Sequence, residues 1–271
     1  DDDGATLATL VRLSRPGRGA HGEPRPDPVY GAQLQPRSTS LSDQLRGHPM
    51  ADALGPGAVA PEADVRLEWE VRSFAYPDGT TLELRAPQLR LDRLGYGPLD
   101  PETRATLRHA PSLAGIGLLA CIDPADVERL ADPDDRDGDG ISGRINMVWD
   151  PDVGAMRPGR FGLKANQASV RTQVAAALHG DMGLSNPVFP QQPCTERQPA
   201  CMAAPHGDDA DGVEVSAALL EAMVFFSMHV GVVDRRLPDD RTVQAGGELF
   251  RRVGCDGCHV PHFRTESGPG F

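Results

Sequence analysis

Three residues with strong cofactor- and metal-binding chemistry lie close together near the end of the sequence. Cys255, Cys258 and His259 form a C-x-x-C-H pattern within the stretch GCDGCHVPH. Three chemistries use closely spaced cysteine and histidine. They are covalent attachment of haem c with the histidine as axial iron ligand, a zinc site, and a redox-active dithiol.

The residues around the motif favour haem. A redox dithiol of this type is expected near a βαβ pattern, and none precedes Cys255. A zinc site needs a fourth ligand, and His262 would be crowded against His259. The stretch DRTVQAGGELFRRVGC has helical spacing and runs directly into the motif, as the first helix of small c-type cytochromes does. We predict that Cys255 and Cys258 are thioether anchors and that His259 is the proximal ligand of the haem iron.

An acidic loop is a second candidate metal site. Asp135, Asp137 and Asp139 alternate in DDRDGDGISGRIN, and Gly140 follows them. Alternate carboxylates on a tight turn suit an oxygen-preferring cation such as Ca²⁺. The glutamate of a full calcium-binding loop is replaced by Asn146. The sequence therefore leaves two alternatives, a calcium site and a solvated acidic turn.

A methionine is the leading candidate for the sixth ligand of the haem iron. Met182 follows a predicted helix that should stop at Gly180, and a thioether can coordinate haem iron. The alternative is a methionine packed in the core. His179 can be explained as a hydrogen-bonded residue at the helix end, and Met228 and His229 as packing residues of a buried helix.

The other three cysteines comprise a closely spaced pair and a single residue. Cys194 and Cys201 close a short loop between prolines, and a disulfide between them is expected in an exported protein. Cys121 is flanked by apolar residues and is expected to be a buried free thiol.

The pattern of apolar and polar residues predicts β-structure in the N-terminal part of the chain. Residues 1–60 are rich in Pro, Gly, Ser and Arg, which indicates extended chain with a short helix near 7–14. Apolar and charged residues alternate in DVRLEWEVRSFAYPDGTTLELRAP, around a turn at Asp78 and Gly79. We expect this β-hairpin to be the only substantial sheet.

The later elements are predicted to be helical. DPETRATLRHAPSLAGIGLLACI contains helical turns interrupted by Pro111, and QASVRTQVAAALHGDMG has a helical apolar face. Residues 213–230 are apolar around most of the helix circumference, which indicates a buried helix. The predicted fold is mainly α, with cytochrome c-like helices around haem, one β-hairpin and long irregular loops.

Composition limits the classes of partner. The 271 residues carry a formal net charge of −12, and an acidic chain repels nucleic-acid phosphates. No apolar run is long enough to span a membrane. The opening DDDGATLATL lacks both a signal-peptide pattern and a starting Met, so a mature or internal fragment is expected.

Six stretches resemble the bacterial di-haem c-type oxidoreductases, a family also described as peroxidases or "thiol oxidoreductases" and distantly related to the di-haem cytochrome c peroxidases. The stretches are DPVYGAQLQ, LRAPQLRLDRLGYGPL, RHAPSLAGIGLLACI, DPDDRDGDGISGRIN, GRFGLKANQASVRTQVAAALHGDMGLSNPVFP and GELFRRVGCDGCHVPHFRT. They occur in the family's order over most of residues 27–265.

The resemblance implies a second C-x-x-C-H upstream of Asp1. It implies an extended segment at 1–60, an inter-haem region at 61–235 and the start of a truncated haem domain at 236–271. The implied function is electron transfer in a periplasmic or exported oxidoreductase, with a redox protein as partner and peroxide as a candidate substrate. The alternative from another class is a zinc- or calcium-stapled extracytoplasmic binding module without redox activity.

Two positions depart from the family pattern. Leu163 stands where the family usually has Trp, so an electron relay through that Trp is not expected here. Ala120 stands where an acidic residue is common, which weakens an acid–base role at that position. The apolar surroundings of Cys121 also argue against a literal thiol oxidoreductase, which needs an exposed thiol of low pKa.

Overall fold

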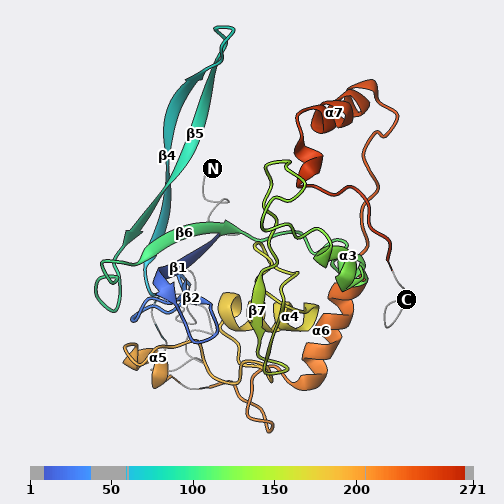
Figure 1. Ribbon diagram of the computed structural model, residues 1–271. Coiled ribbons are helices and arrows are strands. Elements are labelled where there is room, and N and C mark those ends of the chain that lie inside the picture. The colour runs from blue at the N-terminus through green and yellow to red at the C-terminus, as the bar shows by residue number, and fades with distance from the viewer. Residues whose placement is uncertain (1–8, 38–58, 60, 205, 266–271) are drawn as a thin grey trace. The chain divides into compact units, whose positions relative to one another are not determined.

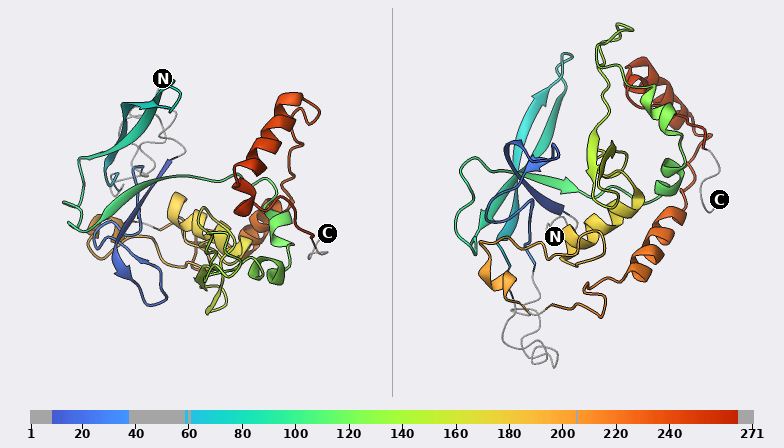
Figure 2. Two further views of the ribbon diagram at one scale, coloured as in Figure 1. Left: turned by 45° about the horizontal axis from the view of Figure 1, so that its top comes forward. Right: turned by 60° about the horizontal axis from the view of Figure 1, so that its bottom comes forward.

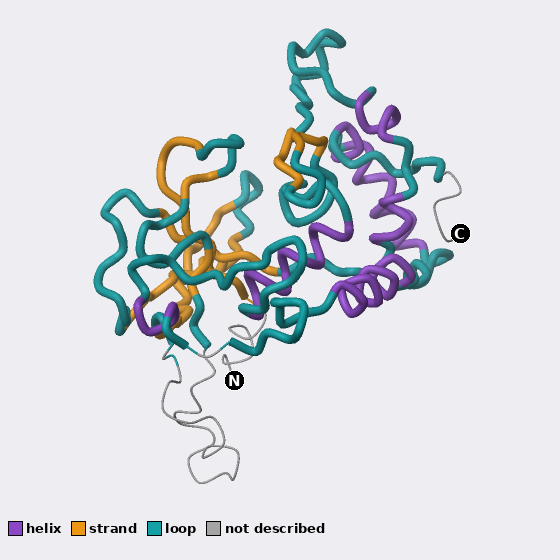
Figure 3. The backbone as a smooth tube through the Cα atoms, turned by 90° about the horizontal axis from the view of Figure 1, so that it is seen from below, coloured by secondary structure: helices purple, strands orange, loops and turns teal. Residues whose placement is uncertain are grey.

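The computed structural model describes residues 9–37, 59, 61–204 and 206–265 (Figure 1). The chain divides into two compact units. The first contains Asp1–Ala110 and Ala175–Ser216, and the second contains Pro111–Val174 and Ala217–Phe271. Loops and turns make up a large share of the backbone trace (Figure 3), as the 30 glycines and 25 prolines suggest.

A four-stranded antiparallel sheet forms the centre of the first unit. Its strands are β1 (Thr9–Arg18), β2 (Pro24–Arg25), β3 (Gln33–Leu34) and β6 (Arg104–His109). β1 pairs with the other three strands, and Val11 lies opposite Leu107 of β6. Val11 and Leu13 alternate with polar residues and are buried, which is the period-two pattern of a half-buried strand. The buried core cluster on this sheet contains Val11, Leu13, Val29, Tyr30, Leu34 and Ala63.

The predicted hairpin is present as β4 (Asp64–Ala75) and β5 (Thr81–Asp92), a long antiparallel pair (Figures 1 and 2). Gly79 in its turn has a φ of 87°, a conformation that glycine adopts without steric cost. Val65 and Leu91 pair at the base of the hairpin and pack against the core cluster. The other end of the hairpin is exposed.

The prediction of a mainly α fold is wrong. Helix and strand each account for 24% of the structure, and several antiparallel sheets are present. The helix predicted near 7–14 overlaps β1, and part of the helical region predicted after residue 100 is β6. The expectation that the hairpin is the only substantial sheet is therefore also wrong. β1 and β6 stabilise each other through pairing between distant segments of the chain, which a local sequence pattern does not show.

The second unit combines short helices with a small hairpin. Its elements are α2 (Ile116–Ala120), α3 (Pro124–Glu128), β7 (Met147–Asp150), β8 (Ala155–Pro158), α6 (Ala217–His229), α7 (Arg241–Arg252) and the 3-10 turn η1 (Cys255–Gly257). α2 lies against the end of α6, and the backbone N–H of Gly115 donates a hydrogen bond to the carbonyl of Val230 at 3.1 Å. None of the described helices is long and apolar enough to cross a membrane.

Two predicted helices differ from the expectation in detail. α4 (Val170–Met182) continues through Gly180 instead of stopping there. A glycine inside a helix costs only about 1 kcal/mol, which the packing of the neighbouring turns offsets. A further short helix, α5, covers Pro199–Met202.

The helix predicted over 213–230 is α6, but it is not buried throughout. Its buried residues are Leu220 and Ser227, while Phe225 and Phe226 are 65% and 66% exposed.

Glu62 is a buried carboxyl group in the first unit, with 7% of its surface exposed. Its Oε2 accepts a hydrogen bond from the backbone N–H of Gln35 at 2.7 Å, and its Oε1 accepts one from Nε2 of Gln198. Burial raises the pKa of Glu62 from 4.5 to about 7 against the effect of these hydrogen bonds, and the negative charge of Asp27 adds to the rise.

We expect the protein to lose stability as the pH rises from about 4.5 through about 7. A carboxyl group with a raised folded pKa holds its proton more tightly in the folded state. The contribution of Glu62 to the free energy of unfolding is therefore complete below the pKa of the unfolded state. It is lost as the pH rises through the pKa of the folded state. The shift corresponds to at most roughly 3 kcal/mol.

Chemical denaturation across this pH range measures the effect. Glu62→Gln should remove this part of the pH dependence, and Glu68→Gln on the exposed hairpin should retain it. Identical pH profiles for wild type and Glu62→Gln would show that Glu62 does not titrate in this window.

Candidate functional site

α7 leads the chain into the C-x-x-C-H motif. The helix begins at Asp240, whose carboxylate accepts hydrogen bonds from the backbone N–H groups of Thr242 at 2.7 Å and Val243 at 3.3 Å. These bonds satisfy two of the free N–H groups of the first turn and hold the pKa of Asp240 below its ordinary value. α7 has no buried residue among its twelve, so its apolar face, which includes Phe250, remains uncovered in the described part of the chain.

A tight turn gathers the three motif residues. Gly254 has a φ of 80°, a left-handed conformation that ends α7 and starts η1. The carbonyl of Cys255 then accepts hydrogen bonds from the backbone N–H groups of Cys258 at 3.3 Å and His259 at 3.0 Å. The ring of Phe250 lies edge-on to the His259 ring, with 5.7 Å between the centroids. The turn therefore fixes two thiols and an imidazole within five residues, directly after an apolar helix face.

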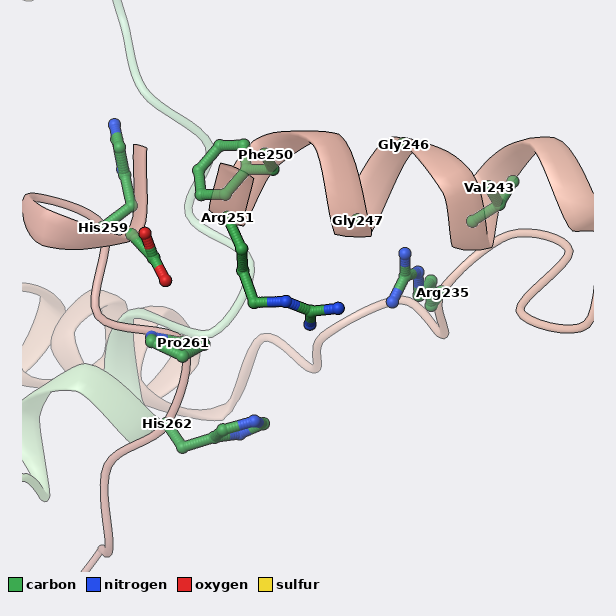
Figure 4. Close-up of a pocket in the computed structure, with 10 residues that line it drawn as sticks. Arg235, Val243, Gly246, Gly247, Phe250, Arg251, His259, Pro261 and His262 are labelled. Atoms are coloured by element: carbon green, nitrogen blue, oxygen red, sulfur yellow. The ribbon is translucent and has the colours of Figure 1, made fainter. Parts of the chain in front are cut away.

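A cavity of about 470 Å³ lies beside this turn (Figure 4). Its lining consists of Arg235, Val243, Gly246, Gly247, Phe250, Arg251, Asp256, His259, Pro261 and His262. A Cβ on Gly246 would meet no atom within 4 Å, so this stretch of the helix surface is open to a flat ligand. The volume lies within the ordinary range for cofactor sites.

The donor set fits a covalently attached haem. Cys255 is half-buried, Cys258 is exposed, and both are free thiols, although neither lines the cavity. His259 lines the cavity and offers an imidazole to an iron ion. Among the described residues, the motif and His262 do not form a group of three side chains close enough to share one metal ion.

A model of the family described as "di-haem oxidoreductase, putative peroxidase" matches residues 14–270, nearly the whole chain. The chain belongs to the di-haem oxidoreductase family. No curated protein and no solved structure matches it. The resemblance noted in the sequence is thus confirmed, and the family implies that haem is bound.

The acidic loop of this di-haem oxidoreductase brings three carboxylates together. Asp135, Asp137 and Asp139 each offer an oxygen atom, and these atoms lie within 4.8 Å of one another. Asp135 has a φ of 50°, and its Oδ1 accepts a hydrogen bond from the backbone N–H of Gly140 at 3.1 Å. The loop approaches the C-x-x-C-H motif, because a Cβ on Gly257 would lie 2.8 Å from Cδ1 of Ile141.

The structure places the sixth-ligand candidates in different settings. Met182 is the last residue of α4 and is 65% exposed, so it neither lies beyond the helix nor packs in the core. Met182 belongs to the first unit and the C-x-x-C-H motif to the second. His179 stacks on Phe189, its Nε2 lies 3.0 Å from the carbonyl oxygen of Gln191, and burial lowers its pKa.

The remaining candidates have structural explanations. Cys194 and Cys201 are joined by a disulfide, and Cys121 is a buried free thiol, as expected from its apolar neighbours. Nδ1 of His229 lies 2.7 Å from the carbonyl oxygen of Phe225. The carbonyl of Met228 lies directly against Gly117 of α2.

The two departures from the family pattern occupy ordinary positions. Leu163 is 53% exposed in a loop of the second unit. Ala120 ends α2, and its carbonyl accepts a hydrogen bond from Nη1 of Arg160 at 3.2 Å. The same Nη1 donates to the carbonyls of Leu119 and Ile122 at 3.1 and 2.7 Å, so Arg160 binds the free carbonyl groups at the helix end.

Sequence reasoning missed the basic residues of the cavity. Arg235 and Arg251 line it, but 27 basic residues in the chain gave no reason to select these two. The helical period offered one signal, because Arg251 lies four residues after Gly247 and therefore shares a face of α7 with it.

Proposed function

We propose that this chain is part of an exported di-haem c-type oxidoreductase and that Cys255, Cys258 and His259 attach one of its haems. Cys255 and Cys258 would hold the cofactor through thioethers, and His259 would coordinate its iron. The bound haem supplies reversible one-electron transfer. The observation that carries the proposal is the turn that holds two free thiols and His259 beside the open, apolar face of α7.

The residues of the turn have distinct tasks in this proposal. The thioethers keep the cofactor on the chain, and the hydrogen bonds to the carbonyl of Cys255 fix the backbone of the ligand histidine. Phe250 packs edge-on against the His259 ring and restricts its rotation. The apolar face of α7 excludes water from one side of the cofactor, which favours the less charged, reduced state of the iron.

The compartment and the partners follow from the same chemistry. Covalent haem c is attached outside the cytoplasm, and the disulfide between Cys194 and Cys201 is consistent with an oxidising compartment. We therefore propose a periplasmic or exported protein that exchanges electrons with a redox protein, with peroxide as the candidate substrate. Met182, whose side chain is exposed at the end of α4, remains a proposed ligand of a haem iron.

Optical spectroscopy with a peroxide assay tests this function. The purified protein should give the sharp visible bands of reduced haem c after addition of dithionite, and hydrogen peroxide should reoxidise it. Haem c bands that hydrogen peroxide does not reoxidise would support the proposed electron transfer and contradict the proposed peroxidase activity. A colourless protein that contains zinc or calcium would support the binding module without redox activity.

We also propose that Asp135, Asp137 and Asp139 bind Ca²⁺. Three carboxylates within a few ångströms repel one another, and a divalent cation relieves that repulsion. Millimolar calcium should raise the melting temperature, by a few degrees if the loop is filled in the folded state only.

Asp137→Ala should abolish this calcium-dependent rise. Asp134→Ala is the matched control, because Asp134 lies in the same loop outside the group of three and pairs with Arg136 at 3.2 Å. Differential scanning fluorimetry with and without calcium measures both variants. An unchanged melting temperature of wild type in calcium would leave the loop as a solvated turn.

A further inference from the structure

Two arginine side chains lie at the cavity beside α7. Arg235 belongs to the loop before α7, and Arg251 to the last turn of the helix. Figure 4 shows the Arg251 side chain running from the helix end toward Arg235. A Cβ on Gly247 would lie 3.8 Å from Nη2 of Arg235, so this guanidinium group is close to the helix surface.

Neither guanidinium group is neutralised within the described part of the chain. Arg235 and Arg251 form none of the ion pairs between described residues. Asp256 also lines the cavity and pairs with neither of them. The carboxylate of Asp240, which begins α7, accepts hydrogen bonds from the helix backbone instead. The two guanidinium groups therefore lie near an apolar helix face, and no described carboxylate forms an ion pair with either of them.

This combination of charge and shape suits a ligand with an apolar body and two carboxylates. A guanidinium group presents paired N–H donors that match a carboxylate in a bidentate arrangement. Haem has this composition, since its porphyrin is apolar and bears two propionates on an edge away from the vinyl groups. If Cys255 and Cys258 hold the vinyl edge, the propionate edge needs cationic partners elsewhere at the cavity.

We propose that Arg235 and Arg251 bind the propionates of the haem attached at Cys255 and Cys258. This assignment rests on the proposed function. The two side chains are positioning residues, and they also set the reduction potential. A positive charge near the iron disfavours the oxidised state, which is the more positive of the two. Removal of either guanidinium group should therefore lower the midpoint potential of this haem, and removal of both should lower it further.

The experiment compares matched pairs of charge-neutralising variants of the full protein. Arg235→Gln and Arg251→Gln change residues that line the cavity. Arg236→Gln and Arg252→Gln remove the same charge from the adjacent positions, which do not line it. The control side chains do not line the cavity and so lie outside the proposed haem site, where salt screens their charge from the iron. The control variants should therefore shift the potential much less.

Spectroelectrochemical titration gives the readout. The wave of this haem is identified as the one that disappears in the Cys255→Ser, Cys258→Ser double variant. Lower potentials in the two cavity variants than in their controls support the assignment. Equal shifts in cavity and control variants overturn it while leaving the proposed function intact. A wild-type protein without covalent haem at this motif overturns the proposed function itself.

Lysine variants cover the case in which glutamine at these positions prevents haem loading. Arg235→Lys and Arg251→Lys keep the positive charge and lose the bidentate fork. The midpoint potentials of the lysine variants should lie between those of the wild type and the glutamine variants. If the glutamine variants carry no haem, the potentials of the lysine variants should lie just below that of the wild type. Lysine variants that match wild type in potential and in its salt dependence would contradict propionate binding by the two forks.

Discussion

Replacing both Cys255 and Cys258 by serine is expected to reduce the haem content of the exported protein by one haem per chain. Serine hydroxyls do not form the thioethers that hold the cofactor, and a haem held only by His259 would dissociate during denaturation. The effect should be a complete loss at this site, with any haem attached elsewhere unchanged. A pyridine haemochrome assay on denatured, washed protein measures the stoichiometry.

Cys121→Ala is the matched control for this variant. Cys121 is a free thiol that is 9% exposed at the end of α2, so its replacement removes a cysteine without touching the motif. It should keep the wild-type haem content, even if some stability is lost from the buried position. A double serine variant with undiminished haem content would rule out attachment at Cys255 and Cys258.

Gly117→Ala is expected to destabilise the second unit by about 3 kcal/mol, the upper end of the usual cost of overpacking. Gly117 is buried in α2, and a Cβ at this position would lie 1.8 Å from the carbonyl oxygen of Met228 in α6. The obstacle is backbone, so the two helices would have to separate. Alanine has a higher helix propensity than glycine by about 1 kcal/mol, which is too little to compensate.

Chemical denaturation followed by circular dichroism measures this effect. Gly231→Ala is the control, because Gly231 follows α6 and a Cβ there would meet no atom within 4 Å. The control should remain within about 0.5 kcal/mol of wild type. Equal stabilities of Gly117→Ala and wild type would show that α2 and α6 do not pack as closely as described.

The sequence predicted those parts of the fold whose signals are local. The alternation around Asp78 and Gly79 gave the hairpin, and the period of the stretch before Cys255 gave α7. β1 and β6 were missed because Val11 pairs with Leu107, which lies far along the chain. Their short apolar alternations gain stability only through that pairing and the core beneath it.

Composition was a poor guide to burial. α6 is apolar around most of its circumference, yet Phe225 is 65% exposed. Apolar residues indicate what a helix can bury, but the packing of other elements decides which face is covered. Gly180 likewise predicted a helix end, and the helix continues past it to Met182.

The candidate site shows the same division. The spacing of Cys255, Cys258 and His259 identified the candidate site, because the C-x-x-C-H pattern is itself a sequence signature. The two arginines that line the cavity have no comparable sequence signature. Arg235 reaches α7 from a preceding loop, and only the folded chain places it beside Arg251.

The most direct test of covalent haem attachment is the mass of the peptide that contains residues 255–259. The exported protein would be extracted with acidified acetone, digested with protease and analysed by mass spectrometry. The proposed function predicts that this peptide carries one haem bound through both cysteines. An unmodified peptide, with all colour in the acetone phase, would contradict it.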